Sequence, residues 1–78
     1  MKVYLAHSGE ITKHGHQVYD LIGVYRDKDM AIKAIEDSMK DVNMQYVKKD
    51  VMPSGNIFWE EHRMDIVTVG YLEVRELL

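Results

Sequence analysis

The chain has 78 residues, with 13 acidic and 10 basic side chains and a net charge of −3 at pH 7. This mild negative charge disfavours non-specific nucleic-acid binding, and the absence of cysteine excludes disulfides and thiolate metal sites. No apolar run approaches the roughly 18–20 residues that span a membrane, and residues 1–6 are too short for a signal-peptide core. We therefore expect one domain over residues 1–78, without a membrane partner, in the cytoplasm of the host cell.

The small size limits the hydrophobic core. A domain of this length buries only about 60–65% of the surface that its unfolded chain exposes. Since no disulfide supplements this thin core, self-association is a remaining route to stability. A homodimer is therefore an early expectation.

Two strands are predicted in the first third of the chain. Residues 2–6 alternate apolar and other side chains, whereas residues 7–16 are polar, contain two glycines and predict a loop. Residues 17–25 predict a second strand, antiparallel to the first and beside it. Both of its faces are largely apolar, which favours a central strand covered on both sides. Gly23 in this strand predicts a close approach of another group to the backbone.

A helix is predicted directly after the second strand. Asp27 is the expected N-cap, and Asp29 places negative charge near the positive end of the helix. The helix is expected to run to Asn43. Small and apolar side chains recur on one stripe with a period of 3.6 residues: Ala31, Ala34, Ile35, Ser38, Met39 and Val42.

Three strands are predicted in the C-terminal half, over residues 44–52, 57–63 and 66–77. Lys48, Lys49 and Asp50 interrupt the first of them, as expected for an edge strand protected against unwanted pairing. The complete order is ββαβββ. It predicts an α+β fold, an antiparallel sheet of about five strands with one helix packed on one face.

One helix is too narrow to cover such a sheet. Five strands at about 4.8 Å span roughly 24 Å, whereas a helix with its side chains covers about 10–12 Å. Aromatic side chains exceed what one helix stripe can bury: Tyr4, Tyr19, Tyr25, Tyr46, Trp59 and Tyr71. We therefore predict a protein–protein interface, in a homodimer or with a host protein. Aromatic anchors dominate such contacts, so the predicted partner-binding residues are Trp59, Tyr71 and Tyr46.

Four histidines raise the question of a metal site: His7, His14, His16 and His62. His14 and His16 flank Gly15 and can approach one ion, with His7 or Glu10 from the same segment. A zinc site needs three or four convergent ligands with supporting hydrogen bonds, so we expect no metal and no cofactor here.

Catalytic patterns are weak. Glu60 and His62 share one face of their predicted strand, with Glu61 on the other, but no nucleophile accompanies them. No phosphate-binding glycine loop or hydrolase motif occurs. We therefore expect a non-enzymatic protein. The alternative is a small-ligand or nucleotide-binding protein that uses a pocket near the His14/His16 loop.

Three segments resemble small uncharacterised proteins that bacteriophages and prophages encode. They are residues 2–10, which end in a Gly-Glu turn, residues 19–25, which end in Gly-Val-Tyr, and the helix start at residues 27–31. The resemblance covers residues 2–40. It implies a phage or mobile-element modulator or inhibitor, which acts by binding a host protein or a host defence complex.

Overall fold

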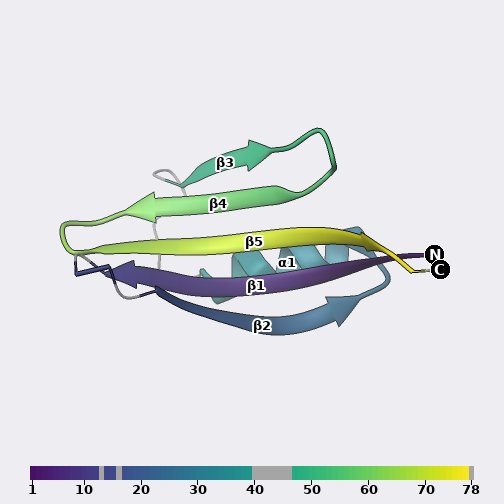
Figure 1. The fold of residues 1–78 in the computed structure, drawn as a ribbon, viewed down its shortest axis with the longest axis horizontal. Helices are drawn as coiled ribbons and strands as arrows, with labels where there is room; N and C mark the ends of the chain where they lie inside the picture. The colour runs from purple at the N-terminus through teal and green to yellow at the C-terminus, as the bar shows by residue number, and fades with distance from the viewer. Residues whose placement is uncertain (13, 16, 40–46, 78) are drawn as a thin grey trace.

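The computed structural model describes residues 1–12, 14, 15, 17–39 and 47–77. These ranges form one antiparallel five-stranded sheet in the order β2-β1-β5-β4-β3, with one helix behind it (Figure 1). The elements are, in chain order, β1 (Lys2–Thr12), β2 (Gln17–Tyr25), α1 (Lys28–Ser38), β3 (Lys48–Val51), β4 (Ile57–His62) and β5 (Ile66–Glu76). The predicted α+β fold, with five strands and one helix on one face, is confirmed.

Strand β1 is twice as long as expected. Its ladder with β5 runs from Lys2 opposite Glu76 to Thr12 opposite Ile66. The prediction of a loop over residues 7–16 was therefore wrong for residues 7–12. The polar side chains there suggested a loop, but β1 pairs with β2 on one side and β5 on the other, and this double pairing holds the backbone extended.

Strand β2 lies at the edge of the sheet, so its predicted central position was wrong. It pairs with β1 alone, because the C-terminal strand β5 occupies the other side of β1. The two chain ends consequently lie side by side (Figure 1), and the Leu77 N–H donates to the Met1 carbonyl at 2.7 Å. The other edge is β3, where Lys48, Lys49 and Asp50 are exposed, as predicted.

Helix α1 begins where expected. The Asp27 carboxylate accepts from the N–H groups of Asp29 at 2.8 Å and Met30 at 3.2 Å, which confirms the N-cap. The helix ends at Ser38, with Met39 as C-cap. The predicted end at Asn43, and Val42 of the predicted stripe, lie outside the described residues. No helix in the described ranges combines the length and apolar character that crossing a membrane requires.

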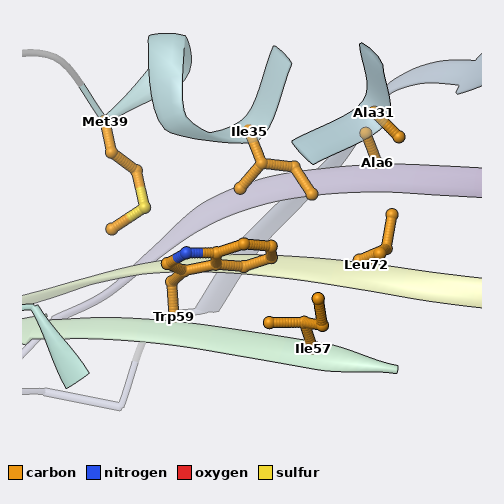
Figure 2. Close-up of a cluster of buried hydrophobic side chains, with 7 residues drawn as sticks. All are labelled: Ala6, Ala31, Ile35, Met39, Ile57, Trp59 and Leu72. Carbon is orange, nitrogen blue, oxygen red and sulfur yellow. The ribbon is translucent and has the colours of Figure 1, made fainter. Parts of the chain in front are cut away.

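The core lies between α1 and the sheet. Figure 2 shows the Trp59 indole between them, with Ile35 and Met39 of the helix pointing toward it. Gly70 lies directly opposite Trp59 in the β4–β5 ladder. A Cβ built on Gly70 would lie 2.5 Å from Ile35 Cγ2. The missing side chain at this position therefore lets the helix approach the sheet closely.

Candidate interaction surface

The sheet face opposite α1 is largely apolar, and we call it the open face. The ladders define it: Trp59, Gly70 and Ala6 point toward the helix, so the residues that alternate with them point away. Its apolar members are Val3, Leu5, Ile11, Tyr19, Leu21, Val24, Phe58, Val67, Val69 and Tyr71. The predicted shortage of cover on the second face is thus present in the structure.

Exposure on the open face increases toward β2. Val69 on β5 is completely buried and Val3 on β1 is only 8% exposed, and both strands lie inside the sheet, between neighbouring strands. Leu21 and Val24 on β2 are 53% and 57% exposed. The apolar side chains of the open face are therefore buried on its central strands and exposed along β2.

Tyr19 links β2 to the middle of the open face. Its strand partner is Gly9, whose own partner on β5 is Val69. Burial raises the pKa of the Tyr19 hydroxyl, with smaller contributions from Tyr71 and Glu60. The row across the sheet at this level therefore runs from Tyr19 over Gly9, which has no side chain, to Val69.

A polar cluster occupies the part of the open face near the chain ends. Arg75 donates to Glu73 Oε2 from Nη2 at 2.6 Å and from Nε at 3.1 Å. His7 Nε2 lies 3.5 Å from the other carboxylate oxygen, and the His7 ring centroid lies 5.7 Å from that of Tyr71. The hydrogen bond from Arg75, followed by the weaker influence of His7, lowers the pKa of Glu73 below its ordinary value of 4.5.

This lowered pKa predicts an acid-dependent loss of stability. Glu73 stabilises the fold above its unfolded-state pKa, and the contribution disappears as the pH falls through the lower folded-state pKa. The variant Glu73→Gln should flatten the dependence of unfolding free energy on pH as the pH falls below the ordinary carboxyl pKa of 4.5. Urea denaturation at several pH values measures this. An unchanged slope in the variant would contradict the assignment, and Glu76→Gln, on the exposed end of β5, is the matched control.

The structure gives a different result for each of the three residues predicted to bind a partner. Trp59 is completely buried against α1, so its predicted role as a surface anchor was wrong. The indole fills the space that Gly70, its ladder partner, leaves beneath the helix. Tyr71 lies half-buried on the open face, where its hydroxyl accepts from Asn56 Nδ2 at 2.8 Å. Tyr46 lies outside the described residues.

Sequence reasoning missed a group of exposed apolar side chains on one strand of the described sheet. It consists of five side chains of β2 that are all exposed: Val18, Tyr19, Leu21, Ile22 and Val24. The sequence contained a feature that could have revealed this group, because residues 17–25 contain only one charged side chain, Asp20. We interpreted this scarcity of charge as the mark of a covered central strand, whereas the strand is an uncovered edge.

The acidic and histidine residues with described positions form pairs and no larger cluster that could hold a metal ion. His62 lies 3.4 Å from Glu60 on the open face, whereas Glu61 points to the helix side, where it accepts two hydrogen bonds from Arg63 Nε at 3.1 Å. This confirms the predicted division of faces. Among the residues with described positions, no three His, Asp or Glu side chains are placed to hold a metal ion; His16 is not among them.

A small polar pocket lies on the helix side of the sheet, near the end of α1. Its volume is about 270 Å³. Its lining residues are Ser8, Gly9, Glu10, Val18, Asp20, Ser38 and Thr68. Hydroxyl and carboxylate oxygens therefore dominate its polar groups. His14 is not among the lining residues.

Comparison with protein-family models, with curated proteins and with solved structures gave no match. The resemblance of residues 2–40 to phage-encoded proteins therefore stays a prediction.

Proposed function

We propose that this protein is a non-enzymatic interaction module that contacts another protein through β2 and the adjoining part of the open face. One observation carries the proposal: five large apolar side chains are exposed on a single edge strand, and three of them, Tyr19, Leu21 and Val24, lie on the open face. Contiguous exposed apolar surface is uncommon on soluble monomers and marks sites of interaction. The Tyr19 ring adds an aromatic group with a polar end, a type that is enriched at interfaces.

The contrast between the two sheet edges supports this proposal. Strand β3 has four residues, three of them charged, which is a common protection against unwanted pairing. Strand β2 has nine residues and one charge. Since the same chain protects one edge and leaves the longer one apolar, the exposed character of β2 fits a contact surface.

The variant Leu21→Lys tests the proposal. A lysine at the middle of β2 should reduce capture of a partner from host lysate at least about tenfold, because central apolar contacts carry most of the energy of an interface. Met64→Lys is the matched control, since Met64 is 97% exposed in the turn between β4 and β5. Quantitative mass spectrometry of the captured proteins is the readout. Equal capture by wild type and Leu21→Lys would remove the proposal.

The proposal extends to a biological role. The resemblance of residues 2–40 to phage and prophage proteins supports a modulator or inhibitor of a host protein, in particular of a host defence complex, inside the host cell. A module of this size acts by occupying a surface of its target. Among the strands that the structure describes, β2 offers the longest exposed apolar edge for this.

The pocket supports a second candidate function, binding of a small ligand. Its carboxylates, Glu10 and Asp20, and the negative C-terminal end of α1 favour a cation over a nucleotide. Its volume falls slightly below the range of about 300–1,000 Å³ typical of ligand sites. Calorimetric titration with spermine discriminates the two functions: heat that Glu10→Gln abolishes supports the ligand site, and no heat removes it.

A further inference from the structure

We propose that β2 pairs with β2 of a second copy of this chain, antiparallel and about a two-fold axis perpendicular to the sheet. The two five-stranded sheets then form one continuous sheet. This inference rests on the proposed function because it uses the same strand. It adds the identity of the partner, which is a second copy of the chain.

The free edge of β2 is suited to strand pairing. The strand has nine residues and is about 30 Å long at 3.4 Å per residue. It is the last strand of the sheet order, so no strand of the described chain pairs with its outer side. Such a row of backbone N–H and C=O groups is a template for another strand.

A bulge determines which residues of β2 share a face. In the ladder with β1, Gly23 pairs with Ala6 and Leu21 pairs with His7, so Ile22 is one extra residue in β2. The alternation of faces therefore shifts at Ile22. Before it, Val18 and Asp20 point to the helix side, and after it, Gly23 and Tyr25 do.

Among the registers that pair most of β2 with a second copy, this shift selects one. A two-fold axis perpendicular to the sheet requires opposing residues to lie on the same face. A register centred on Leu21 fails, since it places Val18 opposite Val24, which lie on different faces. A register centred between Leu21 and Ile22 succeeds. Its opposing pairs are Val18 with Tyr25, Tyr19 with Val24 and Asp20 with Gly23, each on one face, and the bulge residues Leu21 and Ile22 meet at the axis.

The chemistry of these pairs is complementary. Apolar side chains meet apolar side chains, and the carboxylate of Asp20 does not oppose a like charge. Instead it lies opposite Gly23, over which the Tyr25 hydroxyl sits, 2.7 Å from a Cβ built on that glycine. The Tyr25 hydroxyl can donate to Asp20 of the second copy. Because each residue finds its complement within the same strand, the pattern favours a second copy over an unrelated strand.

Oligomeric state gives the first test. Sedimentation velocity should show a wild-type dimer at high micromolar concentration. Leu21→Lys, which places two lysines close to the axis, should raise the dissociation constant at least roughly 100-fold. Circular dichroism confirms that the variant is folded, and Met64→Lys should remain dimeric, since Met64 lies in the β4–β5 turn.

Disulfide trapping tests the register. The natural chain has no cysteine, so introduced thiols are the only ones present. The double variant Tyr19→Cys/Val24→Cys should form a covalent dimer on mild oxidation, because opposing Cβ atoms lie about 4.5–5.5 Å apart. Tyr19→Cys alone should not, since the two copies of this position lie about five residues apart along the pair.

The outcomes separate this inference from the proposed function. A monomeric wild type, a dimer that Leu21→Lys leaves intact, or crosslinking by Tyr19→Cys alone would each overturn it. A monomer that still captures a host protein through β2 would remove the second copy and leave the proposed function standing. A β2-dependent dimer that captures nothing from the host would support the strand pairing and remove the host partner.

Discussion

Replacing Trp59 by alanine is expected to unfold most of the protein. The side chain is completely buried between β4 and α1, against Ile35 and Met39 (Figure 2). Truncation of a buried tryptophan costs about 3–5 kcal/mol. A domain of this size has a total stability of about 4–12 kcal/mol. The variant should therefore lose most of its cooperative unfolding transition, measured by circular dichroism in urea.

The matched variant Trp59→Phe should remain folded. The indole Nε1 is buried and has no hydrogen-bond partner among the residues that the structure describes. Phenylalanine therefore loses volume without losing a hydrogen bond, and it removes a buried polar group that itself costs about 1–3 kcal/mol. The cation–π contact from Lys49, 5.6 Å from the indole centroid, survives in weaker form. A folded and stable Trp59→Ala would restore the prediction that Trp59 is a surface anchor.

Replacing Gly9 by alanine is expected to lower the free energy of unfolding substantially. A Cβ on Gly9 would lie only 1.9 Å from the carbonyl oxygen of Val18, in the backbone of β2. A backbone atom cannot rotate away as a side chain can, so β2 must separate from β1 at this point. We expect a loss of at least about 2–3 kcal/mol in unfolding free energy. Urea denaturation measures it.

The control for Gly9 is the neighbouring variant Ser8→Ala, which adds no atom toward β2. It should stay within about 0.5 kcal/mol of wild type, as is usual for substitutions away from special features. Hydrogen exchange adds a local readout, because the amides of β2 should lose protection in Gly9→Ala before those of β5. A Gly9→Ala protein as stable as Ser8→Ala would show that the two strands do not approach this closely.

Much of the fold follows from local patterns in the sequence. The switch from a strand pattern to a helical period at Asp27 predicted both β2 and the N-cap, because capping depends on side chains within one turn. The charges of residues 48–50 likewise predicted a protected edge strand. Glycine and proline marked the turn between β3 and β4. These features depend on residues close together in the chain.

The sheet order and the site depended on contacts between distant residues. Nothing in residues 17–25 reveals that β5, about fifty residues later, takes the inner side of β1 and leaves β2 at the edge. For the same reason Trp59 was misassigned: an aromatic residue in a strand suits an interface as well as a core, and only its position opposite Gly70 and beneath α1 decides. By itself, the sequence determined the order of the strands and the helix along the chain and the start of the helix, but not the second half of β1. Tertiary structure decided which apolar strand is covered, because coverage depends on which strands become neighbours.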